Sequence, residues 1–141
     1  MRMCALAYRD AGVRTVAGDM CQLPLACSSV GATVCLYSVI HLDKESRARA
    51  YAELFRILRP EGHALIAFHV FDDDVRSGGA RTLTEWWDHE VDLTFRYLDP
   101  EEELAAMVAA GFQFGARVDR APYRGVEHPS HRSYLLVRRP S

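Results

Sequence analysis

The sequence predicts an α/β fold with a mostly parallel sheet, in a single domain that spans residues 1 to 141. Residues 32 to 39, "ATVCLYSV", are almost unbroken in their apolar character, which is typical of a strand covered on both faces. Residues 63 to 70, "HALIAFHV", form a second run of this kind. An amphipathic helix is predicted between the two runs, and a strand, a crossover helix and a parallel strand together make a right-handed βαβ unit.

The first half of the chain supplies this unit and what precedes it. Met3 to Asp10 favours a short helix, and the β-branched residues of Val13 to Ala17 favour a strand. The segment "GDMCQLPLACSS" is predicted to be a loop. From Lys44 to Leu58 apolar residues recur at helical spacing, and Asp43 is the expected N-cap. Proline then ends the helix, and "RPEG" favours a type I turn that leads into the second buried strand.

The second half favours an antiparallel ending. Phe71 to Thr84 is polar and contains glycine, which favours a loop, and "VDLTFRYL" alternates like a half-exposed strand. Asp99 and Pro100 open a predicted helix that ends near Gly111. The segments "FQFGARVDR" and "RSYLLVRR" are predicted to form a final antiparallel hairpin.

Composition excludes several classes of function. The formal net charge is -2, with acidic and basic residues mixed along the chain, so no extended basic field favours nucleic acid as a partner. No apolar run is long enough to span a bilayer. The four cysteines form no C-x-x-C pair and follow no secretory segment, which indicates reduced thiols in a cytoplasm. The abundance of alanine, arginine and valine suggests a GC-rich bacterial genome.

Three segments in register resemble one enzyme family. "GDMCQLPL", "VCLYSVIHL" and "AELFRILRPEGHALIAFHV" resemble the second half of the class I methyltransferases that use S-adenosylmethionine, in the small-molecule branch called type 11. The resemblance implies a Rossmann-like fold, S-adenosylmethionine as cofactor and a small-molecule methyl acceptor. The sequence departs from the family pattern at Cys27, Val30, Gly31 and Glu61, the last being a position where the family commonly has glycine.

A glycine-rich turn of the family is missing from the sequence. In the family, a G-x-G-x-G turn after the first strand holds the methionine end of the cofactor, and an acid after the second strand binds the ribose. Gly78 and Gly79 form the only adjacent glycine pair, and they follow the second buried strand, which is the wrong context for that role. We therefore expect an N-terminally truncated form of the fold that lacks the first two strands and binds the cofactor weakly.

The resemblance implies five cofactor-binding residues. Asp19 would follow the end of a strand, where open α/β sheets bind ligands, and its carboxylate would accept a hydrogen bond from the adenine amino group. Met20 and Leu23 would wall the adenine ring. Tyr37 and Ser38 would face the sulfonium methyl group. The alternatives are that Asp19 stabilises its own turn and that Tyr37 and Ser38 are ordinary strand-end residues.

His41 is the candidate general base. It follows the first buried strand directly, and an imidazole ordinarily exchanges its proton near neutral pH, which suits an acceptor that must be deprotonated. The alternative is that His41 hydrogen-bonds the backbone. Methyl transfer also proceeds without a base, because in-line positioning of an activated sulfonium supplies much of the acceleration.

Other residue patterns predict less. His128 and His131 form an H-x-x-H pair without the cysteine or carboxylate that would complete a metal site, so no metal is expected. "FDDD" is expected to be a solvated strand end. Five aromatic residues either line an apolar substrate pocket or belong to the core, namely Trp86, Trp87, Phe95, Tyr97 and Tyr123.

The predicted function is methyl transfer to a small molecule, and two alternatives stay open. One is a non-catalytic binding module, and the other is an assembly in which two chains complete one sheet. Loss of the first two strands would expose the edge of residues 32 to 38, and an exposed apolar edge is a template for pairing. We expect either that Val13 to Ala17 moves in to cover this edge or that two chains meet there as a homodimer.

Overall fold

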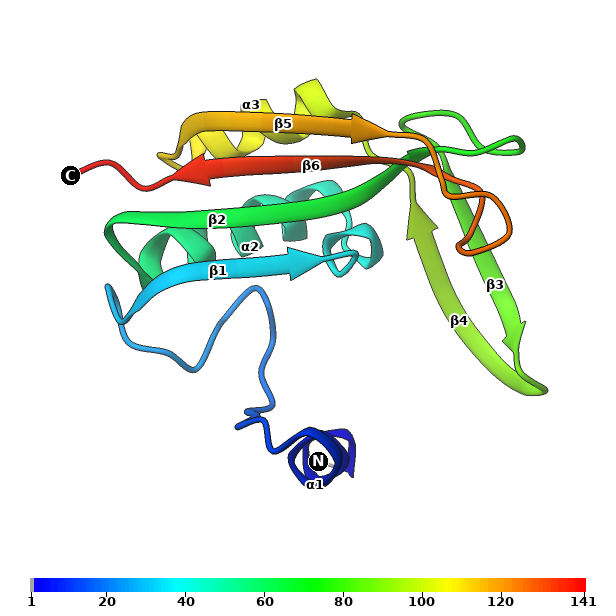
Figure 1. Ribbon diagram of the computed structural model, residues 1–141, viewed down its shortest axis with the longest axis horizontal. Helices are drawn as coiled ribbons and strands as arrows, with labels where there is room; N and C mark the ends of the chain where they lie inside the picture. The colour runs from blue at the N-terminus through cyan, green and yellow to red at the C-terminus, as the bar shows by residue number, and fades with distance from the viewer. Residues whose placement is uncertain (1) are drawn as a thin grey trace.

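The computed structural model describes residues 2–141, and its elements follow the expected alternation of helix and strand (Figure 1). The elements are α1 (Arg2–Ala11), β1 (Val30–Leu36), the 3₁₀ helix η1 (Val39–His41), α2 (Lys44–Ile57), β2 (Leu58–Phe71), β3 (Ala80–Trp86), β4 (His89–Arg96), α3 (Pro100–Ala109), β5 (Gln113–Arg120) and β6 (His131–Arg138).

The main sheet has four strands in the order β1-β2-β6-β5. β1 and β2 are parallel, with Thr33 opposite Ala64 and Leu36 opposite Ala67, so the predicted βαβ unit is confirmed. β6 runs antiparallel to both β2 and β5, which confirms the terminal antiparallel pair. The expectation of a mostly parallel sheet is corrected, because β1–β2 is the one parallel pair among the described strands. The sheet is therefore mixed.

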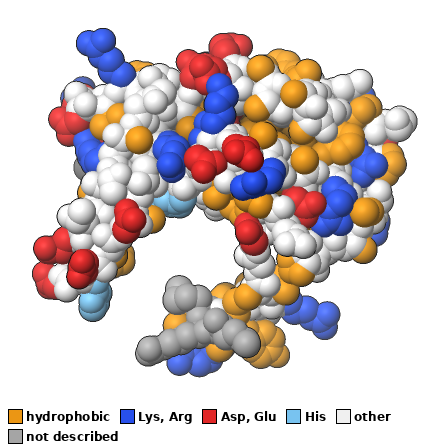
Figure 2. Space-filling model, turned by 180° about the vertical axis from the view of Figure 1, so that it is seen from behind, with side chains coloured by type: hydrophobic (Ala, Val, Ile, Leu, Met, Phe, Trp, Pro, Cys, Tyr) orange, Lys and Arg blue, Asp and Glu red, His pale blue; other side chains and the backbone are white. Residues whose placement is uncertain are grey.

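The helices α2 and α3 cover the same face of the sheet (Figure 1). Each begins at the predicted cap: Asp43 accepts a hydrogen bond from the amide of Ser46 at 2.7 Å, and Asp99 accepts from the amide of Glu101 at 2.9 Å. The buried core lies between these helices and the sheet, and its largest fully buried side chains include Tyr51, Phe68 and Ile40. Figure 2 looks onto this face and shows acidic and basic side chains interspersed over it.

A buried ion pair joins the two helices. The Arg47 Nε donates to both carboxylate oxygens of Glu103, at 3.0 and 3.1 Å, and both side chains are almost inaccessible to water. The hydroxyl of Tyr51 donates to the same carboxylate at 2.5 Å. Burial, followed by the charge of Glu103, raises the pKa of Tyr51 far above its usual value, so the hydroxyl stays a donor. The Glu103 carboxylate thus holds α3 against α2 through its bonds to Arg47 and Tyr51.

The join between α2 and β2 differs from the prediction. β2 is assigned from Leu58, directly after the helix, but its pairing with β1 passes from Leu58 to His63, so the four residues of "RPEG" lie outside the ladder. The amide of Glu61 donates to the Arg139 carbonyl at 2.9 Å, and the amide of Arg139 donates to the Gly62 carbonyl at 2.8 Å. Glu61 has a φ of 67°, a left-handed conformation that favours glycine. A positive φ at the third residue fits a type II turn rather than the predicted type I turn, and the hydrogen bonds to Arg139 hold this turn in place.

β1 is an edge strand, and two predictions about it are wrong. Val13 to Ala17 forms no strand and lies exposed, so it does not cover the β1 edge. β1 is also not covered on both faces, because Val34 is 65% exposed and Leu36 is 51% exposed. In both cases the described chain supplies no neighbouring element for these residues to pack against, and apolar sequence alone does not bury a strand.

β3 and β4 form a separate two-stranded antiparallel arm that projects from the body of the protein (Figure 1). The predicted strand at residues 91 to 98 corresponds to β4, but the predicted loop from Phe71 to Thr84 is corrected, because β3 begins at Ala80. Trp87 and Asp88 connect the two strands with φ values of 50° and 60°, as in a tight hairpin turn that matches the twist of its strands. This arm forms one wall of the candidate site.

Candidate functional site

The site lies where the parallel strands β1 and β2 end side by side. Tyr37 directly follows β1, and its amide donates to the Ala67 carbonyl of β2 at 2.9 Å. Its φ of 55° is unusual for a residue with a side chain, and such backbone strain collects at functional sites. The Tyr37 ring stacks on His69 with centroids 4.8 Å apart. Strand ends of this kind are where open α/β sheets bind ligands.

The Tyr37 hydroxyl belongs to a hydrogen-bonded group beneath the stack. It lies 2.9 Å from the hydroxyl of Tyr134 on β6, and the guanidinium of Arg120 donates to that hydroxyl at 3.0 Å. Burial and the neighbouring Tyr134 raise the pKa of Tyr37 to about 12. Tyr37 therefore stays protonated near neutral pH and serves to hold the strand end rather than to exchange a proton.

His69 is a site residue that the sequence analysis missed. Its Nδ1 lies 2.6 Å from the Oγ of Ser130, which is fully buried. Burial, the charge of Arg132 and the nearby His128 lower the pKa of His69 to about 4. The ring is therefore neutral at physiological pH. The available signal was its position, since His69 ends an apolar strand where a polar side chain has no packing role.

A cavity of about 420 Å³ opens beside His69, between the end of β2 and the arm. Its walls are mostly apolar and come from the arm and the strand ends. The lining residues are His69, Arg81, Leu83, Trp86, Phe95, Tyr97 and His128.

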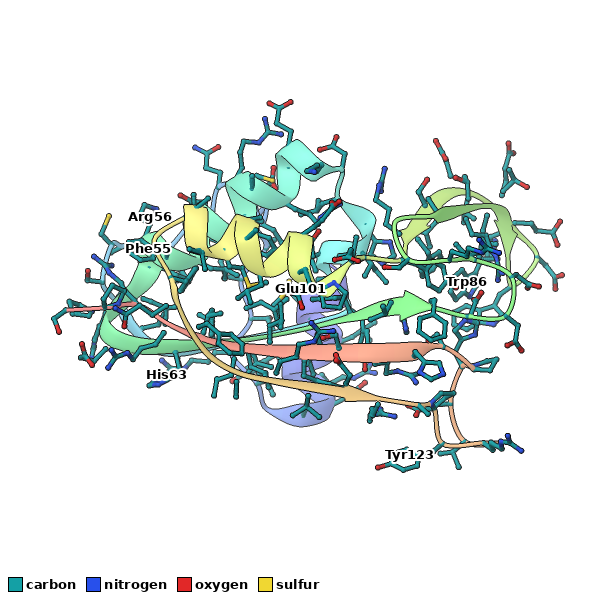
Figure 3. All side chains as sticks on the ribbon, turned by 90° about the horizontal axis from the view of Figure 1, so that it is seen from above. Phe55, Arg56, His63, Trp86, Glu101 and Tyr123 are labelled. Atoms are coloured by element: carbon teal, nitrogen blue, oxygen red, sulfur yellow. The ribbon has the colours of Figure 1, made fainter. Side chains whose placement is uncertain are left out.

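Three of the five aromatic residues proposed for a pocket lie in this cavity. Trp86 stacks on Phe95 with ring centroids 5.4 Å apart, and Tyr97 lines the cavity with them. Trp87 is 84% exposed at the tip of the arm, and Tyr123 is exposed on the β5–β6 loop, away from the body of the protein (Figure 3). The prediction of an aromatic pocket is thus confirmed for the first three residues and wrong for Trp87 and Tyr123.

Asp72 is buried next to the cavity, which corrects the expectation that "FDDD" is solvated throughout. Its side chain is 5% exposed, and its Oδ1 accepts hydrogen bonds from the amides of Asp74 and Val75 at 2.9 and 2.7 Å. Its Oδ2 accepts from the hydroxyl of Tyr97. Although burial opposes it, these hydrogen bonds lower the pKa of Asp72. The chain therefore keeps a charged carboxylate against Tyr97 and His128, two residues that line the cavity.

The structure separates His41 from this cavity. His41 lies in η1, and its Nδ1 is 3.1 Å from the carbonyl oxygen of Thr94 on β4. Its ring packs edge-on against Phe95, and its own carbonyl accepts from Arg96 at 3.0 Å. This is the backbone contact that the alternative interpretation expects. The role of His41 as a base stays a prediction.

Ser38 and the loop of Asp19 lie on the β1 side of the site. The Ser38 hydroxyl donates to the Leu36 carbonyl at 3.2 Å. The Asp19 Oδ1 accepts from the amide of Cys21 at 2.8 Å, so this carboxylate stabilises its own turn, as the alternative interpretation expects. No described residue donates a hydrogen bond to the second oxygen, Oδ2.

The loop is fastened to α2. The amide of Leu23 donates to Glu53 at 2.7 Å, and Arg56 donates to the Leu23 carbonyl at 3.0 Å. Met20 and Leu23 are half-buried against the core. The cofactor-binding roles of Asp19 and these two residues stay predictions.

The two histidines of the H-x-x-H pair point to different partners. His131 stacks on Phe71 with centroids 4.2 Å apart, whereas His128 faces Asp72, with Nε2 and Oδ2 3.5 Å apart. Among residues 2–141, no group of three or more histidine, cysteine, aspartate or glutamate side chains is arranged to hold a metal ion. The described helices also include none long and apolar enough to cross a membrane.

Solved structures define the class of the fold. A SAM-dependent methyltransferase from Methanosarcina mazei superposes with a TM-score of 0.75 at 15% identity, over 99% of this chain and 76% of that one. The [4+2]-cyclase SpnF gives 0.71 at 19% identity, over 99% and 62%. A 1,6-didemethyltoxoflavin-N1-methyltransferase from Burkholderia thailandensis, with 1,6-didemethyltoxoflavin and S-adenosylhomocysteine bound, gives 0.70 at 18%, over 99% and 56%. The chain therefore has the Rossmann-like fold of the SAM-dependent methyltransferases.

The sequence comparison narrows this class. Residues 1–66 match the family described as "Methyltransferase domain", and no curated protein matches the sequence. The resemblance to the class I methyltransferases of type 11 is thereby confirmed. The chain spans between about half and three quarters of the length of the three structures named above.

Proposed function

We propose that this protein transfers a methyl group from S-adenosylmethionine to a small-molecule acceptor. The observation that carries the proposal is the aromatic cavity of about 420 Å³, which opens at the ends of the parallel strands of a methyltransferase fold. A concave apolar site with a few convergent polar groups is the usual form of a small-molecule site. The cysteines of the described structure are free, which is consistent with a reducing cytoplasm, and the abundance of alanine, arginine and valine supports a bacterial source.

The residues on the β1 side fit part of the cofactor. The Asp19 Oδ2 makes no hydrogen bond with described residues and suits an adenine amino group, and Met20 and Leu23 offer apolar surface beside it. Tyr37 and Ser38 lie at the strand end, where the methyl group would be presented. When bound, the cofactor supplies an electrophilic methyl group on a sulfonium. What these residues contribute is its placement.

The described residues include no glycine-rich turn for the methionine end of the cofactor, and this favours a second candidate function. Gly78 and Gly79 lie between β2 and β3, where Gly78 donates its amide to the Tyr97 carbonyl at 2.7 Å. They are therefore occupied by the base of the arm. A non-catalytic binding module, or an assembly in which a second chain completes the cofactor site, is consistent with this arrangement.

Calorimetry with S-adenosylmethionine and S-adenosylhomocysteine separates these functions. Three missing hydrogen bonds to the cofactor, each worth about 0.5 to 3 kcal/mol, weaken binding by roughly a thousandfold or more. We therefore expect a dissociation constant well above the micromolar range. Asp19→Ala should weaken it further, and Asp73→Ala, at an exposed aspartate outside the loop, is the matched control. Micromolar binding that D19A abolishes would show that the chain builds a complete cofactor site.

Catalysis is tested separately at saturating cofactor. The 141-residue chain is incubated with S-adenosylmethionine labelled in the methyl group and with a panel of small aromatic acceptors. Transfer that Trp86→Ala suppresses supports the proposal, because Trp86 lines the cavity and no residue of the Asp19 loop does. Cofactor binding without transfer to any acceptor supports the non-catalytic module.

A further inference from the structure

Asp72 and His128 form a pair at the rim of the acceptor cavity. Four groups fix the Asp72 carboxylate: the amides of Asp74 and Val75, the hydroxyl of Tyr97, and the guanidinium of Arg81 at 3.7 Å. The carboxylate is buried and cannot turn away from the His128 ring, whose Nε2 is 3.5 Å from Oδ2. Contacts of this kind are often long in unliganded sites and tighten when substrate binds.

The backbone of His128 is fixed as firmly as its partner. Its carbonyl accepts hydrogen bonds from the amide of Ser130 at 2.8 Å and from Arg132 at 2.9 Å. Arg132 is itself buried and is held by Glu127 at 3.1 Å. The His128 ring lines the cavity and is half-exposed, and its Nδ1 makes no hydrogen bond with described residues. An imidazole that lines a cavity, with one nitrogen facing a carboxylate and the other without a hydrogen-bond partner among the described residues, is arranged to accept a proton.

His69 lines the same cavity but is unsuited to this task. Its pKa of about 4 makes it a poor proton acceptor at neutral pH, and Ser130 already occupies its Nδ1. A neutral ring at this place still orients a polar group and adds no positive charge beside a sulfonium. The two histidines are therefore suited to different roles: His69 to positioning the acceptor, and His128 to accepting its proton.

The lining of the cavity also restricts the acceptor. Leu83, Trp86 and Phe95 present flat apolar surface that fits an aromatic ring. Arg81 is the one lysine or arginine among the lining residues, and it is bound to Asp74 at 2.9 Å. No unpaired cation in the lining is therefore available for a carboxylate or a phosphate. A neutral aromatic molecule with one acidic hydroxyl matches these walls.

We propose that the acceptor is an aromatic hydroxyl compound and that His128, oriented by Asp72, is its general base. This inference rests on the proposed function. The acceptor oxygen forms a bond to the methyl carbon while the carbon–sulfur bond breaks, and the electron pair of that bond stays on sulfur. The hydroxyl proton passes to Nδ1 of His128, and the imidazolium shares its charge with Asp72 until the proton leaves to solvent. Asp72 is a positioning residue, since it acts through His128.

The first test uses 4-nitrophenol without cofactor, since its ionised form absorbs visible light. Bound beside His128, the probe should release its proton at a pH about one unit lower than in solution, because a nearby cation stabilises the phenolate. The charged and titratable groups around the His128 ring are Asp72, His69, Tyr97, Arg81 and Arg132.

The variants for this test are His128→Gln, Asp72→Asn and Trp86→Ala. The first two should return the ionisation of the probe to its solution value, and W86A should weaken binding about tenfold. His131→Gln is the matched control, because His131 belongs to the same sequence pair but does not line this cavity. In ¹⁵N NMR, D72N should change the tautomer of the His128 ring, whereas H131Q should not.

The second test measures methyl transfer with two acceptors. H128Q should slow the methylation of phenol about a hundredfold and that of already ionised 4-nitrophenolate much less, a contrast that a merely structural role would not produce. Failure of 4-nitrophenol to bind overturns the acceptor class. If 4-nitrophenol binds but its ionisation is the same in the wild type, H128Q and D72N, the role of His128 is overturned, even if methylation occurs. A His128-dependent ionisation without any methylation supports the inference about the pair and contradicts the proposed function instead.

Discussion

His69 makes the stability of the fold depend on pH. Its pKa is about 4 in the folded chain, whereas an exposed histidine in the unfolded chain has a pKa near ~6.5. Between these values the unfolded chain binds the additional proton, so the free energy of unfolding falls as the pH is lowered from about 6.5 to about 4. Above this window the neutral ring contributes its full stability.

The size of the effect follows from the difference of about 2.5 between the two pKa values. At full strength this corresponds to roughly 3.4 kcal/mol. The ring is partly accessible to solvent at the cavity, so we discount the figure for screening and expect a loss of about 1 to 2 kcal/mol.

Urea unfolding at pH 7 and pH 4 measures this loss in the wild type and in His69→Gln. Carboxylates also titrate in this range, so the difference between the two chains isolates the contribution of His69. We expect H69Q to lose about 1 to 2 kcal/mol less than the wild type on acidification. His63→Gln, which removes an exposed ring from the same strand, is the matched control. Equal losses in wild type and H69Q would show that the ring is not held neutral in the folded chain.

Three further predictions concern the body of the fold. Arg47→Met leaves the buried Glu103 carboxylate without its cation and should lower the free energy of unfolding by about 3 to 5 kcal/mol in urea titrations, and a loss below 1 kcal/mol would contradict the buried pair. Glu61→Gly removes the steric strain of a side chain in a left-handed backbone, whereas Glu61→Ala retains it, so E61G should be more stable than E61A by about 1 kcal/mol. Equal stabilities of the two variants would contradict strain at this position. The exposed edge of β1 is expected to pair with a second copy of the chain, and Val34→Lys should then convert a dimer to a monomer in sedimentation equilibrium, whereas a wild-type monomer would rule out this pairing.

Local signals in the sequence predict the centre of the fold well. The apolar runs of β1 and β2 and the helical spacing between them define the βαβ unit, because periodicity reports which face of an element is buried. The caps at Asp43 and Asp99 were predictable for the same reason, since a cap depends on the residues within one turn of it. The terminal antiparallel pair was predicted from two neighbouring segments, "FQFGARVDR" and "RSYLLVRR", that a loop joins.

Predictions failed where distant parts of the chain decide the structure. "RPEG" has the composition of a type I turn, but Glu61 is left-handed and its amide donates to the carbonyl of Arg139, near the other end of the chain. Val13 to Ala17 has strand composition, and its local preference is not sufficient without a partner strand. Prediction of the candidate site failed for the same reason. His69, Asp72 and His128 lie close together in the structure but come from β2, the segment after β2 and the β5–β6 loop. The spacing of these three residues in the sequence does not predict that their side chains lie together.

The arm of β3 and β4 shares no strand pairing with the main sheet, yet it supplies most of the apolar wall of the acceptor cavity. Under the proposed function, the residues that select the acceptor and the residues that maintain the main sheet therefore lie in different stretches of the chain. Substitutions at Leu83, Trp86 or Phe95 alter the shape offered to an acceptor while every hydrogen bond of the four-stranded ladder stays in place. If the cavity takes the methyl acceptor as proposed, acceptor preference can change through substitutions in β3 and β4 while the ends of β1 and β2 stay as they are.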